Sequence, residues 1–268
     1  MRFTEAIKLF EKAGIDNAPY DAAQIFMHFG GFSRADLIGR DIDCDGVDLL
    51  RAINERCEHK PLQYIIGEVG FYRETYKVSP DCLIPRSDTE ILVDYAVRHI
   101  PSGAHFADLC TGSGCVAIST LKNTSGTTAT AVDLSGGALS IAEENAAKNQ
   151  VSDRLSFVCA DALRSAIDGE FFAVLSNPPY VTESAYKELA PEIYFEPKMA
   201  FVGGEDGLVF YERITELYKN KIAPHGFIGY EIGFDQGESL KEIAKKHGMS
   251  AEIVKDYSGN DRVCILRK

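Results

Sequence analysis

The sequence predicts an α/β protein in which a mostly parallel sheet follows a small helical region. Short apolar runs of strand length alternate with helical patterns over the last two thirds of the chain, and this alternation is typical of a parallel sheet. A strand, a glycine turn and a helix follow one another between residues 105 and 121. The first sixty residues instead place apolar side chains at helical spacing.

The N-terminal region predicts four helices, and we expect it to form a helical domain covering residues 1–60. Thr4 is available as the N-cap of the first helix, and Asp21 opens the second. The other two helices are expected at Arg34–Ile38 and Val47–Cys57. Residues 61–82 form a connector, in which the alternating run Thr75–Val78 favours a β-hairpin.

The third region, residues 83–268, carries the predicted sheet. It opens with Ser87–Glu90, whose residue types fit a helix capping box. The apolar runs that predict strands are His105–Leu109, Thr128–Val132, Leu155–Cys159, Phe171–Ser176, Gly226–Ile232, residues 251–257 and Arg262–Arg267. The turn composition of residues 258–261 permits an antiparallel hairpin between the last two strands.

Acidic side chains stand at three of the predicted strand ends. Asp108 precedes the turn Cys110–Gly114, Asp133 follows the second strand, and Asp161 follows the third. Ligands of open α/β sheets bind at the carboxyl ends of the strands. Asp133 can accept from both hydroxyls of a ribose, Asp161 can meet an adenine edge, and Asp108 can engage a cationic amino-acid group. S-adenosylmethionine combines these three groups and has no phosphate.

The glycine turn also satisfies the G-x-G-x-x-[GA] pattern of dinucleotide-binding folds at Gly112–Ala117. A dehydrogenase is therefore a rival interpretation. Two features weigh against it. Asp108 would repel a pyrophosphate, and the motif that follows the strand Phe171–Ser176 has no role in hydride transfer.

That motif, Asn177-Pro178-Pro179-Tyr180, predicts a site for a planar NH2 group. Proline has no backbone N–H, so the segment is a rigid row of hydrogen-bond acceptors beside an aromatic ring. We expect the Asn177 side-chain oxygen and the Pro178 carbonyl to accept the two protons of a substrate amide. Tyr180 is expected to pack against the amide plane. A proline turn without a ligand is the alternative.

Together these motifs resemble the PrmC/HemK-type protein-(glutamine-N5) methyltransferases, which are class I S-adenosylmethionine-dependent enzymes that modify peptide chain release factors. The similarity extends from about residue 60 to the C-terminus. Other segments similar to the family are residues 61–67, Phe71-Tyr72, residues 83–86, Thr89-Glu90, residues 195–197, residues 203–208, residues 231–233 and residues 261–263.

The resemblance implies a Rossmann-like seven-stranded sheet, S-adenosyl-L-methionine as methyl donor and S-adenosyl-L-homocysteine as product. The implied substrate is the glutamine of the Gly-Gly-Gln loop in class I release factors, which the N-terminal domain would dock. The family's cofactor-binding positions fall on Cys110, Thr111, Gly112, Ser113, Gly114, Asp133, Ala162 and Asn177. The sequence departs from the family at Cys110, where glycine is common, and at Ser87 and Asp88, where proline and glutamate are usual.

Two other functions stay open at this point. One is N-methylation of an exocyclic amino group in nucleic acid, at adenine-N6 or guanine-N2, because the same acceptors suit an aromatic NH2 group. Against it, the chain has a net charge of −12 and no Lys/Arg stripe. The other is a noncatalytic protein that binds S-adenosylmethionine and docks on the translation machinery. The intact Asn177 weighs against that role.

Composition bounds the remaining properties. No run of eighteen apolar residues exists, so no membrane span is expected, and the N-terminus lacks a signal pattern. We therefore expect a cytoplasmic protein. No His/Cys cluster has ligand spacing, so no metal site is expected. Nothing in the sequence indicates an obligate assembly, and a monomer is expected.

Overall fold

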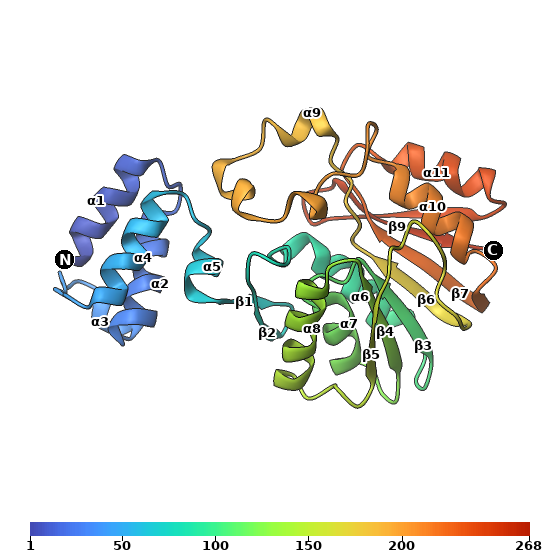
Figure 1. Ribbon diagram of the computed structural model, residues 1–268, viewed down its shortest axis with the longest axis horizontal. Coiled ribbons are helices and arrows are strands. Elements are labelled where there is room, and N and C mark those ends of the chain that lie inside the picture. The colour runs from blue at the N-terminus through green and yellow to red at the C-terminus, as the bar shows by residue number, and fades with distance from the viewer. The chain divides into compact units, whose positions relative to one another are not determined.

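The computed structural model describes residues 1–268 and divides the chain into two compact units (Figure 1). The helical unit consists of Met1–Glu68 together with Ala190–Phe195. The α/β unit consists of Val69–Leu189 together with Glu196–Lys268. The helical unit therefore extends beyond the expected residue 60, and a short segment from far along the chain joins it.

Five helices and a 3₁₀ turn build the helical unit. They are α1 (Phe3–Ala13), α2 (Ala18–Gly30), α3 (Arg34–Leu37), α4 (Val47–Cys57), α5 (Leu62–Ile66) and η2 (Pro191–Phe195). Its core includes Phe10, Phe26 and Ile53, all fully buried, and Leu62 of α5 packs into the same core. This packing explains why the unit continues past the connector expected to begin at residue 61.

Two helix starts differ from the sequence-based expectation. Thr4 lies inside α1 and is not its N-cap, because its backbone N–H and its hydroxyl both donate to Asp41. The second helix begins at Ala18 and not at Asp21, with Pro19 in its first turn, a position where the missing N–H carries no cost. Asp21 instead turns inward as a buried acid.

A buried ion pair accounts for that inward acid. Arg56 of α4 donates from Nε to Asp21 of α2 at 2.7 Å, and both side chains are almost completely buried. The same guanidinium donates to Glu192 of η2 at 3.3 Å and to the carbonyl of Lys60 at 3.2 Å. His59 also contacts Glu192, at 3.3 Å. One arginine thus ties three separate segments of the helical unit together.

The α/β unit carries a seven-stranded sheet in the order β5-β4-β3-β6-β7-β9-β8. Its strands are β3 (His105–Leu109), β4 (Thr128–Asp133), β5 (Leu155–Cys159), β6 (Phe171–Ser176), β7 (Ile222–Glu231), β8 (Ser250–Lys255) and β9 (Asp261–Arg267). The first five pair in parallel, and β9 pairs antiparallel with both β7 and β8. The predicted Rossmann-like sheet and its C-terminal hairpin are confirmed.

Helices cover both faces of this sheet (Figure 1). The longer ones are α6 (Glu90–His99), α7 (Cys115–Lys122), α8 (Gly136–Lys148), α10 (Val209–Tyr218) and α11 (Gly237–Lys246). Side chains of α6, α7 and α8 share one apolar core, whereas α10 and α11 belong to a second core. The remaining short elements are β1 (Glu68–Phe71), β2 (Glu74–Lys77), η1 (Ser87–Thr89), α9 (Glu183–Tyr186) and η3 (Lys198–Ala200).

The connector contains the expected hairpin, because β1 and β2 form a separate two-stranded sheet. The capping box expected at Ser87–Glu90 is not formed. Residues 87–89 make a 3₁₀ turn ahead of α6, and the hydroxyl of Thr89 donates to Glu231 at 2.5 Å. The Glu90 carboxylate accepts from the backbone N–H of Tyr72 at 2.7 Å. Long-range partners thus outcompete the local cap.

No helix in the chain has both the length and the apolar character that crossing a membrane requires.

Candidate active site

A cavity of about 430 Å³ lies at the carboxyl ends of β5, β4, β3 and β6. A second, smaller cavity adjoins it, since the two share Cys110, Gly112 and Asn177 as lining residues. The predicted site residues that line the larger cavity are Cys110, Gly112, Asp133, Asp161, Ala162, Asn177 and Pro179. Those that line the smaller one are Asp108, Cys110, Thr111, Gly112, Ser113 and Asn177.

Three predicted residues line neither cavity: Gly114, Pro178 and Tyr180. Gly114 is the N-cap of α7 and has a φ of +81°, a left-handed conformation that favours glycine. A Cβ on Gly114 would lie 2.9 Å from the Ile118 side chain and 3.1 Å from that of Ala142. Gly114 therefore permits the close packing of α7 against α8, which is a supporting role for the turn.

Asp108 is almost completely buried at the end of β3. Its Oδ2 accepts from the Thr111 hydroxyl at 2.6 Å and from the backbone N–H of Ala117 at 3.1 Å. Its Oδ1 has no partner in the protein, and neither has the buried hydroxyl of Ser113, which lines the same small cavity. Burial raises the pKa of Asp108 to about 7. Two unsatisfied polar atoms beside one cavity indicate a polar ligand there.

Asp133 and Asp161 stand at the ends of β4 and β5, on the larger cavity. The two oxygens of Asp133 accept from the backbone N–H groups of Gly112 at 2.8 Å and Ser135 at 2.9 Å. Each oxygen keeps a lone pair for a further donor. Burial raises the pKa of Asp133. Asp161 accepts from the backbone N–H of Leu163 at 2.9 Å.

Cys110 occupies a backbone conformation that favours glycine, with φ at +58°. The departure from glycine at this position therefore places a side chain in a left-handed turn. Burial raises the pKa of the Cys110 thiol, so the sulfur is a neutral, poorly nucleophilic group against the cavity.

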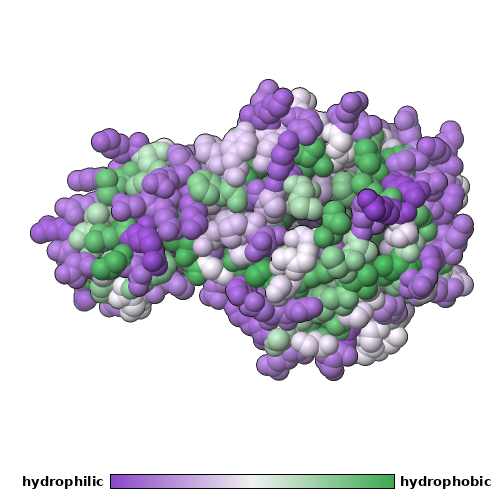
Figure 2. All heavy atoms as spheres, viewed as in Figure 1, coloured by the Kyte–Doolittle hydropathy of each residue, from purple (hydrophilic) through white to green (hydrophobic).

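The rim of the larger cavity is apolar. Three of its lining residues are large hydrophobic side chains with substantial exposure: Leu134, Met199 and Val209. Figure 2 shows apolar residues, in green, gathered among hydrophilic ones on the visible face of the α/β unit. Such a lining suits a flat aromatic ring or an apolar part of a substrate.

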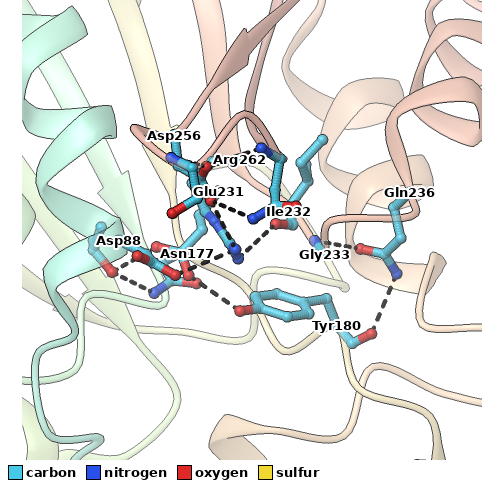
Figure 3. Close-up of polar contacts among 12 residues, drawn as sticks. Asp88, Asn177, Tyr180, Glu231, Ile232, Gly233, Gln236, Asp256 and Arg262 are labelled. Atoms are coloured by element: carbon cyan, nitrogen blue, oxygen red, sulfur yellow. Dashed lines mark hydrogen bonds and ion pairs between the residues drawn. The ribbon is translucent and has the colours of Figure 1, made fainter.

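The segment Asn177–Tyr180 leaves the sheet at the carboxyl end of β6, beside the end of β7. Asn177 and Pro179 line the larger cavity, and the Asn177 Nδ2 donates to the Thr89 hydroxyl oxygen at 3.1 Å. Tyr180 points its hydroxyl at Glu231, which accepts at 3.1 Å (Figure 3). From the sequence we expected the Tyr180 ring to pack against the plane of a substrate amide. In the structure its hydroxyl donates to Glu231.

Glu231 lies at the end of β7 and is almost completely buried. It accepts from the hydroxyls of Thr89 and Tyr180, one on each oxygen. Burial raises the pKa of Glu231 to about 7, although both hydrogen bonds and the nearby Arg262 favour its charged form. Arg262 itself pairs with Asp88 at 3.2 Å and with Asp256 at 3.4 Å (Figure 3).

Sequence reasoning missed the roles of Thr89, Glu196 and Glu231. Glu196, buried, accepts from the backbone N–H of Ile84 at 2.9 Å and pairs with Arg86, so it holds residues 84–86 beside the small cavity. All three residues lie in segments that resemble the family, and this resemblance was the one feature of the sequence that could have pointed to a role for them. Their contacts span more than a hundred residues of sequence, so no local pattern could assign them.

No group of three or more His, Cys, Asp or Glu side chains in the chain is arranged to hold a metal ion.

Two family models match the chain. The PrmC N-terminal domain matches residues 3–67, and the methyltransferase small domain matches residues 87–202. A release factor glutamine methyltransferase of Thermodesulfovibrio yellowstonii is 40% identical over 222 residues, which cover 81% of this chain and 79% of the relative. The corresponding protein of Flavobacterium psychrophilum is 33% identical over 276 residues, which cover 98% of this chain and 95% of the relative.

Among solved structures, the ribosomal protein L11 methylase of Lactobacillus delbrueckii subsp. bulgaricus superposes with a TM-score of 0.52 at 17% identity, covering 71% of this chain and 83% of that one. This likeness shows the methyltransferase fold alone. The relatives and the family models, which agree over both units, decide the family. The chain belongs to the release factor glutamine methyltransferases.

Proposed function

We propose that this protein transfers a methyl group from S-adenosylmethionine to the side-chain amide nitrogen of the glutamine in the Gly-Gly-Gln loop of class I release factors. The family supplies the reaction class. The observation that carries the proposal is the Asn177 amide, which is anchored through its nitrogen at the edge of a cavity and leaves its oxygen available as an acceptor.

The residues around the two cavities fit S-adenosylmethionine. The unpartnered Asp108 Oδ1 and Ser113 hydroxyl would accept from the ammonium group of its amino-acid part. Asp133 would accept from the ribose hydroxyls, and Asp161 with Ala162 would border the adenine. When bound, the cofactor supplies an electrophilic methyl group on a sulfonium and leaves as S-adenosylhomocysteine after one C–S bond breaks.

The chain's own residues have to orient a poor nucleophile. An amide nitrogen shares its lone pair with the carbonyl, so it attacks only when it is held in line and its developing positive charge is stabilised. The Asn177 oxygen and the Pro178 carbonyl would accept the two N–H groups and so provide both effects. The N–C bond forms as the C–S bond breaks, and the nitrogen then loses its proton to water.

We also propose the partner and the role of the helical unit. The unit formed by Met1–Glu68 and Ala190–Phe195 would dock the release factor, and the α/β unit would carry the chemistry. A substrate from the translation machinery places the reaction in the cytoplasm, and we expect the enzyme to work as a monomer. The family favours a glutamine amide over the amino group of a nucleic-acid base, as does the absence of a basic stripe.

The direct test is intact-peptide mass spectrometry on a recombinant class I release factor incubated with this protein and S-adenosylmethionine. One added methyl group, mapped to the glutamine of the Gly-Gly-Gln loop, is the expected result. The control is the same factor with that glutamine replaced, which should stay unmodified. Absence of methylation, with cofactor binding confirmed, would refute the substrate. A tRNA and a DNA duplex assayed in parallel report the nucleic-acid alternative.

A further inference from the structure

The four polar side chains of Asn177, Thr89, Glu231 and Tyr180 form one continuous hydrogen-bonded chain (Figure 3 shows Asn177, Tyr180 and Glu231). We propose that Thr89 and Glu231 are positioning residues that set which end of the Asn177 amide faces the substrate. This inference rests on the proposed function, because it assigns the two residues to the acceptor that the methyl transfer requires.

The direction of each hydrogen bond follows from chemistry. The ionised form of Glu231, which the two hydroxyls and the nearby Arg262 favour, can only accept hydrogen bonds, so in that form the hydroxyls of Thr89 and Tyr180 both donate to it. A threonine hydroxyl has a single proton. Once Thr89 has given that proton to Glu231, its oxygen can only accept from Asn177. The Asn177 nitrogen therefore faces Thr89, and its carbonyl oxygen must point to the other side.

The burial of Thr89 and Glu231 makes the direction of these hydrogen bonds important for the orientation of the Asn177 amide. Thr89 is 1% exposed and Glu231 is 2% exposed, so a hydrogen bond that either residue loses leaves a buried polar group without its protein partner. An asparagine amide is nearly symmetric in shape, and a flip exchanges its oxygen for an NH2 group. A flipped Asn177 would offer donors to the NH2 group of the substrate and would repel it. The chain from Glu231 excludes that orientation.

Register explains why these residues meet. Ser176 of β6 lies opposite Tyr230 of β7, so Asn177 and Glu231 are the next residues at the same edge of the sheet. Thr89 comes from the 3₁₀ turn before α6 and bridges them. This turn replaces the capping box expected at Ser87–Glu90, and it places Thr89 between Asn177 and Glu231.

The test is Thr89→Val, which keeps the shape of the side chain and removes its hydroxyl. With no fixed partner for its nitrogen, Asn177 samples both orientations, and kcat for release-factor methylation should fall about tenfold or more. The KM for S-adenosylmethionine should change less than kcat does, because the cofactor would keep its contacts with Asp108, Asp133 and Asp161. Thr89→Ser restores a hydroxyl and should recover most of the lost kcat.

A matched control separates orientation from loss of stability. Thr215→Val also removes a fully buried threonine hydroxyl, one that bonds the Tyr230 hydroxyl at 3.0 Å and makes no contact with Asn177. Thr215→Val should lower the melting temperature by about as much as Thr89→Val does, and it should leave kcat near the wild-type value. Glu231→Gln is the second variant, because a glutamine can donate to Thr89 and allow the reversed polarity, so kcat should fall there too.

Three results would overturn the inference. They are a Thr89→Val enzyme with kcat within twofold of wild type, a Thr89→Ser enzyme as slow as Thr89→Val, and a Thr215→Val enzyme that slows equally. The wild-type protein in the same assay keeps the two proposals apart. If the wild type does not methylate the release factor, the proposed function fails; if it does and the variants behave as wild type, only the positioning role fails.

Discussion

The two ends of the Asn177 side-chain amide have different proposed roles. Its nitrogen is held by Thr89 at 3.1 Å, so in the proposed mechanism its oxygen would be in place as an acceptor before the substrate amide arrives. A preorganised acceptor stabilises the charge that develops on the substrate nitrogen without a cost of reorganisation.

Asn177→Ala removes this acceptor. We expect the rate of methyl transfer to fall by about 10²-fold or more, since one preorganised hydrogen bond at a developing charge commonly contributes that much. Binding of S-adenosylhomocysteine, measured by calorimetry, should survive better than turnover. Near-normal turnover in this variant would contradict the acceptor role.

Asp108→Asn tests the proposed contact with the ammonium group of S-adenosylmethionine by its effect on the affinity for that ligand. The variant loses a charge-assisted hydrogen bond from the cofactor, so the dissociation constant of S-adenosylmethionine should rise about tenfold or more. The amide can still accept from Thr111 and Ala117. Equal cofactor affinity of the wild type and the variant at pH 8 would place the ammonium elsewhere.

The same variant also tests a pH dependence of stability in the cofactor-free protein. Burial raises the pKa of Asp108 from 3.8 to about 7, and the neighbouring Asp133 adds to the rise, so between these pH values the native state binds more protons than the unfolded state. The contribution of Asp108 to stability is therefore lost as pH rises through about 7. Denaturant unfolding of both proteins at pH 5 and pH 8 should show Asp108→Asn gaining stability relative to wild type at the higher pH. An unchanged difference would indicate that Asp108 is ionised at both.

Among the elements, the loop of residues 203–207 supports the Asn177–Tyr180 segment from outside. Gly203 donates its N–H to the Val181 carbonyl at 2.9 Å, and a Cβ on Gly203 would lie 2.3 Å from the Pro179 carbonyl oxygen. Only a residue without a side chain permits this approach. The glycine fixes the distance between the loop and the backbone of the acceptor segment.

Gly203→Ala should displace the Pro179 backbone, because the added Cβ would clash with its carbonyl oxygen. Overpacking of this kind costs about 1–3 kcal/mol, and we expect a loss of activity larger than the loss of folded protein explains. Gly70→Ala is the matched control, because a Cβ there meets no atom within 4 Å. Both variants can be compared by thermal unfolding and by the methylation assay. A Gly203→Ala enzyme as active as Gly70→Ala would show that the segment tolerates the displacement.

At the scale of the whole molecule, the path of the chain sets the composition of the helical unit. Residues 190–195 follow the acceptor segment in sequence and belong to the unit formed by the N-terminus. Arg56 holds this segment through Glu192 while it neutralises the buried Asp21. The helical unit is therefore complete only when a piece of chain from beyond residue 189 is present.

Arg56→Met should destabilise this unit by about 3–5 kcal/mol, because it leaves the carboxylate of Asp21 buried without a partner. Residues 190–195 should become more sensitive to limited proteolysis at the same time. Arg51→Met on the same helix is the control: its ion pair with Asp48 is exposed and should matter little. The double variant Asp21→Asn with Arg56→Met should recover part of the loss. Equal unfolding curves for the two single variants would show that the buried pair is dispensable.

The sequence by itself determined the class of the sheet, most strand positions and the acidic residues at the strand ends that line the cavities. The strands His105–Leu109 and Phe171–Ser176 have the bounds that their apolar runs predict, because burial on both faces leaves a continuous apolar signal. The edge strand Leu155–Cys159 also has its predicted bounds, although Ser156 and Cys159 are exposed. Asp108 and Asp133 were predictable for a related reason: parallel strands bring their carboxyl ends to a single edge.

Only the tertiary structure decided the partners of those residues. The positions of Thr89 and Glu231, 142 residues apart, and of Arg56 and Glu192, 136 residues apart, are set by strand order and by the return of the chain to the helical unit. A local pattern predicted a capping box over Ser87–Glu90, but Thr89 donates to the buried Glu231 and Glu90 accepts from Tyr72. A buried polar group must form its hydrogen bonds with the groups that the fold brings within reach. Local spacing in the sequence does not predict which groups these are.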